Sequence, residues 1–407
     1  MKNPASVEEY ITTGGFEALK KAITMSTGNI LDELKTAKLL GRGGAGFPLD
    51  IKWNQMVNAG DFPKYIICNA DESEPGTFKD KLLLEADPLN VIEGMLIAAF
   101  LFRSEKSYIY IRGEYRVIQD RFQEALDNAK KAGYLGNSIL GIHDFSHDIS
   151  IISGSGAYIC GENSALLNSI EKGVGRPRIK PSHEMGLYGK PTLVNNVETF
   201  ACIPVILNLG GEGFLNLGDE SGGGTKLISL SGHIKNRGVY EIPLGTPVQT
   251  ILYDEKYGGG SSTGKSIEFC HFGGQSGPIG FKEQLLCSYS YGDMEKNDLA
   301  IGSGAIVVMD SGVDILEYLK KVLEFFVFES CGRCTPCRIG TMRVLEQLEC
   351  FLDNRAKTGD IDKLEDLINN MTALSACGLG KTAGRAVLSC LRYRRNVFEY
   401  RTRQSKS

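Results

Sequence analysis

The chain has 407 residues, 42% of them hydrophobic, and a formal net charge of -4. This length and composition predict a globular protein with two or three cores, and the near balance of 45 basic and 49 acidic residues argues against a nucleic-acid partner. The longest apolar run, Val91 to Phe102, is interrupted by Glu93 and too short for a membrane span, and no signal segment precedes it, so we expect a cytoplasmic protein without membrane insertion.

The first half of the chain alternates β-rich and helical segments. Three β-rich runs, Tyr65 to Asn69, Ser107 to Gly113 and Ile149 to Gly154, predict a parallel α/β sheet. Between the second and third runs, residues 116–132 have a helical apolar face, and Gly133 follows as a helix-terminating residue. The apolar face consists of Ile118, Phe122, Ala125, Leu126 and Ala129. We therefore predict a crossover helix over this segment.

A glycine-rich segment and a later acidic segment together predict a ligand site. The segment Leu39 to Pro48 holds four glycines within six residues, which allows backbone N–H groups to approach a phosphate or a flat ring closely. Lys52 follows as a possible phosphate or flavin ligand, and the first predicted strand runs into Ala70 to Asp80, which contains four acidic residues. Open α/β sheets bind ligands at the carboxyl ends of their strands, and carboxylates there suit ribose hydroxyls or flavin N–H groups. The alternatives are a surface turn and a solvated acidic loop.

In the second half of the chain, the predicted secondary structure changes at two points. A glycine-rich break, Ser221 to Gly224, precedes short β-like runs and the loop Gly258 to Gly264, which predict a small β domain. After Asp310, three segments with helical spacing surround a cysteine motif. We therefore predict three domains, over residues 1–224, 225–310 and 311–407.

The cysteines of the C-terminal region predict a metal cluster. Cys331, Cys334 and Cys337 form a C-x2-C-x2-C motif, and Cys377 follows after two helical segments. Three close thiolates and one remote thiolate suit a [4Fe-4S] cluster. Structural zinc is the alternative, although zinc sites usually pair two C-x2-C units or include histidine, and no histidine lies nearby. Cys390 could compete with Cys377 for the fourth ligand position.

Several motifs, in their order along the chain, resemble those of one family. They are GRGGAGF, NADESEPGTFKD, GAYICGEN, GRPRIKP, GKPTLVNNVET, GSG and ESCGRCTPCRIG. Together they resemble the NADH-binding flavoprotein subunits of respiratory complex I and the homologous subunits of NAD-linked hydrogenases and formate dehydrogenases. The resemblance implies a Rossmann-like FMN domain, a β-grasp (ubiquitin-like) domain and a helical bundle that holds one [4Fe-4S] cluster. We expect the segment Asn195 to Thr199 of the fifth motif to be a strand that lies beside the flavin.

The resemblance also implies the ligands of each cofactor. Predicted flavin contacts, with the other glycines of the turn included, are Gly41, Arg42, Gly43, Gly44, Gly46, Lys52, Asn69, Asp71, Glu72, Tyr158, Gly161, Glu162, Val194, Asn195, Asn196 and Thr199. Glu72 and Glu162 are the predicted catalytic residues, since negative charge near the flavin disfavours its anionic reduced form. For NADH, Phe47 is the predicted adenine-stacking ring, Glu74 a ribose partner and Lys180 a contact near adenine. The predicted cluster ligands are Cys331, Cys334, Cys337 and Cys377.

Three positions depart from the family pattern. Gln55 and His183 stand where the family usually has aromatic residues, and Asn163 stands where it has a second glutamate. Loss of two rings weakens stacking on adenine, by roughly 1 to 3 kcal/mol per base. A neutral Asn163 removes a repulsion that would otherwise disfavour the 2′-phosphate of NADPH. The nucleotide preference is therefore less closely specified than flavin binding.

The predicted activity is hydride transfer between NADH and FMN, with single electrons passing to the cluster and on to partner subunits. Longer relatives carry fused electron-carrier domains for which the ends of this chain are too short, so we expect a small thioredoxin-like [2Fe-2S] subunit and a larger iron-sulfur subunit as partners in a hetero-oligomer. The alternatives are an NADP-linked or electron-bifurcating version of the same module, and a non-catalytic scaffold with structural zinc.

Overall fold

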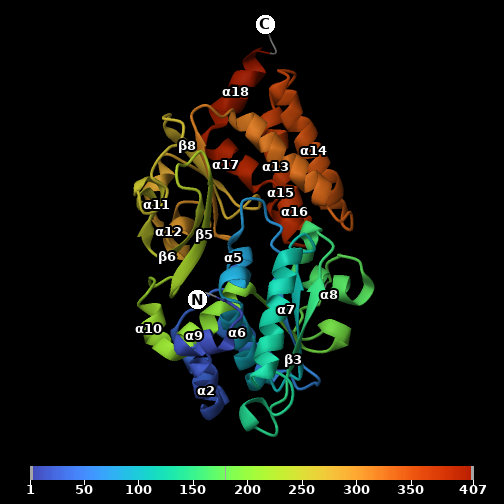
Figure 1. Ribbon diagram of the computed structural model, residues 1–407. Helices are drawn as coiled ribbons and strands as arrows, with labels where there is room; N and C mark the ends of the chain where they lie inside the picture. Colours follow the sequence, from blue (N-terminus) through green and yellow to red (C-terminus); the bar gives the residue numbers. More distant parts are fainter. Residues whose placement is uncertain (1–2, 179, 405–407) are drawn as a thin grey trace. The chain divides into compact units, whose positions relative to one another are not determined.

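A computed structural model describes residues 3–178 and 180–404 and divides the chain into two compact units (Figure 1). Unit 1 comprises the residues up to Ser73, Phe78–Leu227 and Glu241–Leu244. Unit 2 comprises Glu74–Thr77, Ile228–Tyr240 and the residues from Gly245 onward. The predicted β domain and helical domain thus lie mainly in one compact unit, and the three-domain division stays a prediction.

Unit 1 is built on a four-stranded sheet with the order β3-β2-β1-β4. All three strand pairings are parallel, as the alternation of β-rich and helical segments predicted. The strands are β1 (Tyr65–Ala70), β2 (Lys106–Ile111), β3 (Asp148–Ser153) and β4 (Thr192–Asn196). The chain moves outward on one side from β1 to β3, and β4 then returns to the other side of β1. The strand order therefore reverses between β1 and β4, where open α/β sheets bind their ligands.

Helices α6 (Pro88–Phe102), α7 (Arg116–Lys131) and α9 (Val197–Leu209) pack against this sheet (Figure 1). The predicted crossover helix is confirmed as α7, because all five residues of its apolar face are buried and Gly133 has a positive φ of 81°. The apolar run that contains Glu93 is α6, which is buried on almost every side. A Cβ added at Gly94 would lie 2.1 Å from the Phe200 carbonyl oxygen, so only glycine allows α6 to pack this closely on α9.

The structure explains why the acidic residue Glu93 interrupts the apolar run. Its carboxylate accepts hydrogen bonds from the backbone N–H groups of Phe16 and Leu19, both at 2.9 Å, and from the Tyr10 hydroxyl at 2.6 Å. Phe16 and Leu19 lie at the start of α2 (Glu17–Thr24), where N–H groups have no partner within the helix. The buried acid thus anchors the N-terminal helices to α6.

The remaining helices of unit 1 surround this core. They are α1 (Val7–Thr12), α3 (Thr27–Thr36), α4 (Leu49–Asn58), α5 (Lys79–Ala86), α8 (Asn163–Lys172), α10 (Gly211–Leu215) and the short 3-10 helices η1 (Ile139–Gly141), η2 (Tyr158–Gly161) and η3 (Leu187–Gly189). One local expectation is wrong. The segment Asn195 to Thr199, taken from the sequence as one strand, is strand only as far as Asn196, because the Asn196 side chain accepts from the Glu198 N–H and begins α9.

A second sheet, whose residues belong mainly to unit 2, has five strands in the order β6-β5-β11-β8-β9. Strands β5 and β11 are parallel, whereas β8 is antiparallel to both β11 and β9. The strands are β5 (Thr225–Gly232), β6 (Gly238–Pro243), β8 (Ile267–Phe272), β9 (Ile279–Phe281) and β11 (Ala305–Asp310), and β7 (Thr246–Pro247) pairs separately with β10 (Ser288–Tyr289). A mixed β region is therefore confirmed, while its assignment as a β-grasp domain stays a prediction.

The predicted helical C-terminal region is confirmed. It holds α13 (Ile315–Glu329), α14 (Thr335–Leu352), α15 (Asp360–Leu374), α16 (Gly378–Thr382), α17 (Arg385–Tyr393) and α18 (Arg395–Gln404). Shorter helices α11 (Val248–Tyr253), η4 (Gln284–Leu286) and α12 (Tyr291–Lys296) accompany the sheet. Within the described ranges, each helix is either too short or too polar to cross a bilayer.

Candidate functional site

The glycine-rich segment forms a closed turn that leads into α4. Its base is held by hydrogen bonds from the Gly41 N–H to the Phe47 carbonyl, at 2.9 Å, and from the Leu49 N–H to the Leu39 carbonyl, at 3.0 Å. Gly44 and Gly46 have φ angles of 128° and 61°, which side-chain-bearing residues rarely adopt. The glycines therefore set the shape of this turn.

This turn packs on the junction between β4 and α9. The Arg42 N–H donates to the Thr199 hydroxyl oxygen at 2.9 Å, and a Cβ at Gly43 would lie 3.1 Å from the Asn196 Cβ. The structure thus brings together two segments that the sequence separates by more than 150 residues. The Arg42 guanidinium is fully buried and donates to the Gly223 carbonyl at 2.7 Å. Arg42 therefore anchors the turn in this structure, and direct contact with a flavin stays a prediction.

Lys52, on α4, also reaches this junction. Its ammonium group donates to the carbonyl oxygen of Val194 on β4. Burial lowers the pKa of Lys52 to about 8, and no carboxylate within the described residues forms an ion pair with it. A buried cation without a counter-ion is a good partner for a phosphate or another anionic group.

Asn69 and Asn195 carry amide groups at the neighbouring ends of β1 and β4. Asn69 lies opposite Asn196, and Cys68 opposite Asn195, in the β1–β4 pairing. The Asn69 side chain donates to the Gly161 carbonyl at 2.9 Å and accepts from the Asp71 N–H at 3.1 Å. Asn195 is buried, and its Nδ2 has no hydrogen-bond partner among the described residues. Because such a donor is costly to leave unpaired, it indicates a missing acceptor, and a flavin carbonyl fits this requirement.

The two predicted catalytic glutamates cap helices. The Glu72 carboxylate accepts from the N–H groups of Asp80, at 2.7 Å, and Lys81, at 3.0 Å, at the start of α5. Glu162 is the N-cap of α8 and accepts from the N–H groups of Ser164, at 3.1 Å, and Ala165, at 2.8 Å. Both carboxylates are thus held in place by backbone donors. Burial, followed by the Asp80 charge, raises the pKa of Glu72.

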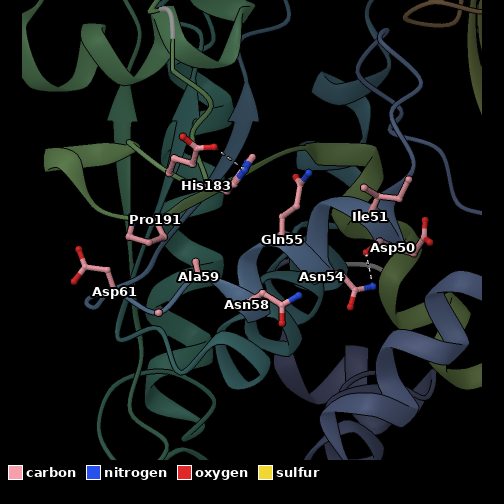
Figure 2. Close-up of a pocket in the computed structure, with 11 residues that line it drawn as sticks. Asp50, Ile51, Asn54, Gln55, Asn58, Ala59, Asp61, His183 and Pro191 are labelled. Carbon is pink, nitrogen blue, oxygen red and sulfur yellow. Dashed lines mark hydrogen bonds and ion pairs between the residues drawn. The ribbon is translucent and has the colours of Figure 1, made fainter.

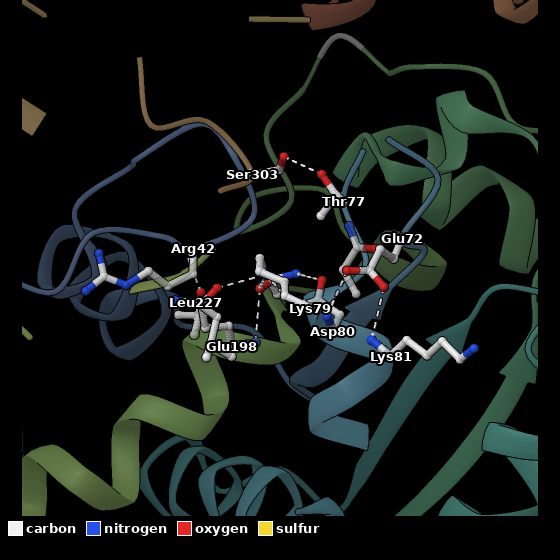
Figure 3. A network of polar contacts seen from close by, with 12 residues as sticks. Arg42, Glu72, Thr77, Lys79, Asp80, Lys81, Glu198, Leu227 and Ser303 are labelled. Carbon is white, nitrogen blue, oxygen red and sulfur yellow. Dashed lines mark hydrogen bonds and ion pairs between the residues drawn. The ribbon is translucent and has the colours of Figure 1, made fainter. Parts of the chain in front are cut away.

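A buried network of charges lies beside these residues (Figure 3). The Glu198 carboxylate pairs with Lys226 at 2.5 Å and with Lys79 at 2.8 Å, and Lys79 also pairs with Asp80 at 2.6 Å. Asn196 donates to Asp80 at 2.7 Å and so joins the network to the β4–α9 junction. Both lysines are at most 1% exposed. Sequence reasoning did not single out Lys79, Glu198 or Lys226, since nothing in their spacing shows that they meet.

The charge states of this network follow from opposing effects. Burial alone would raise the pKa of Glu198, but Lys226 and Lys79 outweigh it and lower that pKa. Burial lowers the pKa of Lys226, and Glu198 only partly offsets this effect. For Lys79, the charges of Asp80 and Glu198 outweigh burial and raise the pKa. Glu198 therefore stays ionised between Lys79, which stays protonated, and Lys226, whose pKa burial lowers to about 7.

The predicted NADH contacts lie in different places. Phe47 is 44% exposed in the glycine turn, and Lys180 is also exposed. Glu74 belongs to unit 2, where its carboxylate accepts from the Ser276 N–H at 2.9 Å. A Cβ at Gly274 would lie 2.2 Å from the Glu74 Cγ, so the loop around Gly274 fits closely against this side chain.

Two of the departures from the family pattern line one pocket of about 740 Å³ in unit 1 (Figure 2). Gln55 comes from α4, and His183 from the loop before β4. Three carboxylates also line the pocket, those of Asp50, Asp61 and Glu184. Asp61 pairs with Lys190 at 3.1 Å, whereas Asp50 forms no ion pair with any described residue. The pocket therefore has a negative lining.

In unit 2, the four predicted cluster ligands lie around the start of α14. Burial raises the pKa of the Cys337 thiol to about 11, the Ser330 hydroxyl lowers it, and Cys334, Cys377 and Cys331 raise it further. The three other cysteines are thus close enough to Cys337 to interact with it electrostatically. Across the described residues, no three Cys, His, Asp or Glu side chains form a group that could hold one metal ion. Cys390 is fully buried in α17.

A glycine allows this cysteine arrangement to close. A Cβ at Gly380, in α16, would lie 2.8 Å from the Cys337 Cβ and 2.4 Å from the Ser375 Oγ. Gly332 has a φ of 71°, which lets the chain turn between Cys331 and Cys334. The thiols, the turn and the close packing of α16 fit a polynuclear group that is held by three neighbouring ligands and one remote ligand.

A parallel α/β unit with a buried lysine and an unpaired buried amide at its switch point, and a helical region that brings four thiols near one another, fit a flavin- and iron-sulfur-dependent oxidoreductase. Comparisons with known proteins agree. The family model described as "Nuo51 FMN-binding domain" matches residues 34–205, and the model described as "NADH-ubiquinone oxidoreductase-F iron-sulfur binding region" matches residues 317–401.

Individual relatives cover almost the whole chain. An NADH-quinone oxidoreductase subunit of Aquifex aeolicus is 41% identical over 95% of this chain and 89% of its own length. The NADP-reducing hydrogenase subunit HndC of Solidesulfovibrio fructosivorans is 38% identical over 98% of this chain and 81% of its own length. A chain of an NAD+-reducing [NiFe]-hydrogenase, crystallised in the H2-reduced state, superposes with a TM-score of 0.83 at 32% identity. The match covers 93% of this chain and 64% of that one.

The chain belongs to the family of these NADH-quinone oxidoreductase subunits and their hydrogenase counterparts. The predicted resemblance is therefore confirmed, and so are the predicted cofactors of the family, FMN, NADH and a [4Fe-4S] cluster. Members of the family are oxidoreductases that transfer electrons from NADH through FMN to the cluster. This membership favours electron transfer over a non-catalytic zinc scaffold.

Replacing Lys52 by Met tests its role as the partner of an anion. Loss of a charge-assisted hydrogen bond is expected to weaken FMN binding by about tenfold or more, which flavin fluorescence titration measures. Because FMN favours the protonated amine, whose pKa is about 8, wild-type affinity is expected to fall as the pH rises above 8. The variant is expected to lose this pH dependence. The exposed Lys35→Met variant serves as the control, and equal affinities of all three proteins would contradict the assignment.

The burial of Lys52 also affects the stability of the flavin-free protein. The pKa of Lys52 is lowered in the folded state, so between about pH 8 and 10.5 the unfolded state binds more protons. Lys52 is therefore expected to contribute stability that increases through this interval, so the stability of the wild type relative to Lys52→Met should rise with pH. Thermal unfolding followed by Trp53 fluorescence measures this, because Trp53 is the single tryptophan and lies buried in unit 1.

Replacing Glu198 by Gln is expected to destabilise unit 1 by about 3 to 5 kcal/mol, because two buried lysines lose their shared counter-ion. Urea unfolding of the flavin-loaded protein, again followed by Trp53 fluorescence, measures the change. The matched control is Glu17→Gln, since Glu17 forms an exposed pair with Lys20 and should contribute less than about 1 kcal/mol. Equal effects of the two substitutions would contradict the assigned role of the network.

Proposed function

We propose that the β1–β4 switch point of unit 1 binds FMN and that unit 1 accepts a hydride from NADH. The observation that carries the proposal is the convergence there of the Lys52 ammonium, which has a carbonyl partner but forms no ion pair with a described residue, and the Asn195 amide nitrogen, which has no hydrogen-bond partner among the described residues. Both suit the acceptors of a flavin mononucleotide, and the glycine turn supplies a backbone surface beside them. When bound, FMN takes two electrons with a hydride and releases them singly.

The residues of the chain position the cofactor and set the local charge. Lys52 and Asn195 would bind and orient FMN, while the Glu198 network keeps the β4–α9 junction rigid beneath it. The helix-capping bonds of Glu72 and Glu162 hold two carboxylates in fixed positions, from which they would make the flavin harder to reduce to an anion. No side chain is required as a general acid or base for the hydride transfer.

We further propose that the pocket of Gln55 and His183 accepts the adenosine end of the nucleotide. Its volume suits a ligand of that size, and Phe47 lies three residues before Asp50, which lines it. The carboxylates of Asp50, Asp61 and Glu184 would repel the 2′-phosphate of NADPH, which favours NADH. NADPH is the second candidate because the hydrogenase relative is named as NADP-reducing and Asn163 is neutral.

In unit 2, the proposed cluster ligands are Cys331, Cys334, Cys337 and Cys377. Electrons would pass from this cluster to partner subunits, for which we propose a small thioredoxin-like [2Fe-2S] protein and a larger iron-sulfur protein. The names of the relatives, which are subunits of a quinone oxidoreductase and a hydrogenase, support a hetero-oligomer. Because the proposed ligands are four reduced thiols and the proposed donor is NADH, we place the protein in the cytoplasm.

Flavin bleaching under anaerobic conditions tests the activity and the nucleotide choice together. NADH is expected to bleach the flavin absorbance of the FMN-loaded protein faster than NADPH at equal concentration. If neither nucleotide bleaches the flavin, the proposed hydride transfer is wrong. If NADPH is the faster donor, the second candidate replaces the first.

The double substitution Asp50→Asn and Glu184→Gln is expected to reduce the preference for NADH over NADPH. A single charge repulsion of about 1 kcal/mol corresponds to roughly a fivefold change in the ratio of the two bleaching rates. Asp61→Asn is the matched control, because Asp61 lines the same pocket but is already compensated by Lys190. An unchanged ratio in the double variant would show that these carboxylates do not select the nucleotide.

Cysteine replacement tests the fourth cluster ligand. Cys377→Ala is expected to remove most of the iron and acid-labile sulfide, because a cube with three thiolates lacks one corner ligand. Cys390→Ala is expected to keep both, since Cys390 is a fully buried residue of α17 and is not among the cysteines that act on Cys337. The opposite pattern would transfer the ligand role to Cys390, and zinc without sulfide in the wild type would refute the cluster.

A further inference from the structure

A buried hydroxyl group without a partner lies among the proposed cluster ligands. Ser375 is 4% exposed, and its Oγ has no hydrogen-bond partner among the described residues. The residue ends α15 and stands two positions before Cys377. A buried hydroxyl that donates to nothing costs about 1 to 3 kcal/mol, so its burial indicates an acceptor beside it.

The surroundings of Ser375 show which acceptor this is. A Cβ atom added to Gly380 would lie 2.4 Å from the Ser375 Oγ and 2.8 Å from the Cys337 Cβ. Since Gly380 has no Cβ, the hydroxyl and the Cys337 side chain share this space. The hydroxyl is therefore next to one proposed ligand in space and to another, Cys377, in the sequence. The hydrogen-bond acceptors of the proposed cluster and of its cysteine side chains are all sulfur atoms.

A second serine, Ser330, also lies at the C-terminal end of a helix, close to the proposed cluster ligands. Ser330 is the C-cap residue of α13 and directly precedes Cys331, and Ser375 is the C-cap residue of α15, two positions before Cys377. The Ser330 Oγ lies 3.3 Å from the Cys337 Sγ and accepts from the Gly332 N–H at 3.4 Å. Because the oxygen already accepts a hydrogen bond, its own proton is available to the sulfur. Both helices thus end in a hydroxyl that faces the cysteine group.

We propose that the Ser375 hydroxyl, assisted by Ser330, donates a hydrogen bond to a sulfur of the cluster and raises the reduction potential of the cluster. The inference rests on the proposed cluster site. The cluster gains one negative charge when it accepts one electron, and a hydrogen bond to its sulfur is stronger in that state. The serine proton stays on its oxygen, and no covalent bond forms or breaks. The two residues therefore position and tune the cluster without coordinating it.

The test is a redox titration of the intact protein, with the reduced cluster measured by electron paramagnetic resonance. In Ser375→Ala, the ratio of reduced to oxidised cluster at a fixed ambient potential is expected to fall about tenfold, which is a downward shift of 59 mV for a one-electron couple. Ser330→Ala is expected to shift in the same direction. Ser375→Thr retains the hydroxyl and is expected to restore the wild-type potential.

Thr341→Val is the matched control. The Thr341 hydroxyl is fully buried and also contacts Cys337, but it donates to the Cys337 carbonyl oxygen at 2.9 Å and not to sulfur. Its removal is expected to leave the potential unchanged. An equal shift in Thr341→Val and Ser375→Ala would overturn the proposal, because it would assign the effect to packing around Cys337.

The remaining outcomes are also decisive. An unchanged potential in Ser375→Ala, with full iron and sulfide content, overturns the inference and leaves the cluster itself in place. Loss of the cluster in both Ser375→Ala and Ser375→Thr overturns it as well, since the side chain would then serve packing alone. Loss in Ser375→Ala with a wild-type potential in Ser375→Thr supports it. A wild-type protein without acid-labile sulfide would instead refute the proposed cluster site.

Discussion

The parallel pairing of β1 with β4 is the constraint on which the candidate flavin site depends. It places Asn69 opposite Asn196 and aligns the carboxyl ends of two strands that are separated by more than 100 residues in the sequence. The strand order reverses at this pair, and open α/β sheets bind their ligands outside the carboxyl ends of the strands at such a point. The glycine turn and α4 reach the same edge, through the bond from Arg42 to Thr199 and through Lys52.

Buried charge makes this arrangement rigid and also leaves it incomplete. Glu198 neutralises Lys226 and Lys79, and Asn196 ties the network to the strand end, so the junction has little freedom to rearrange. Lys52 and the Asn195 amide have no comparable partners of their own. The same distinction appears in unit 2, where the Thr341 hydroxyl is satisfied by a carbonyl and the Ser375 hydroxyl is not. In both units, these groups lie in the segments that the FMN-binding and iron-sulfur family models match.

Sequence reasoning predicted the elements whose patterns are local. The helical face of α7, the three β-rich runs and the helices around the cysteines were all confirmed, because periodicity of apolar residues reports burial directly. The junction after Asn196 was mistaken for continuous strand, since helix capping by Asn196 depends on a single side-chain bond. The helix-capping roles of Glu72 and Glu162 were missed, although an acid shortly before a helix is a recognisable cap signal.

The sequence by itself determined the chemistry of this protein. Its motifs identified the family, and the spacing of three cysteines selected an iron-sulfur cluster over zinc, because ligand type and local spacing are properties of short segments. Tertiary structure decided which side chains meet and which remain unsatisfied. The triad of Glu198, Lys226 and Lys79, the shared pocket of Gln55 and His183, and the buried hydroxyl of Ser375 all depend on long-range packing. No local pattern encodes those contacts, since each arises only when distant segments are brought together by the fold.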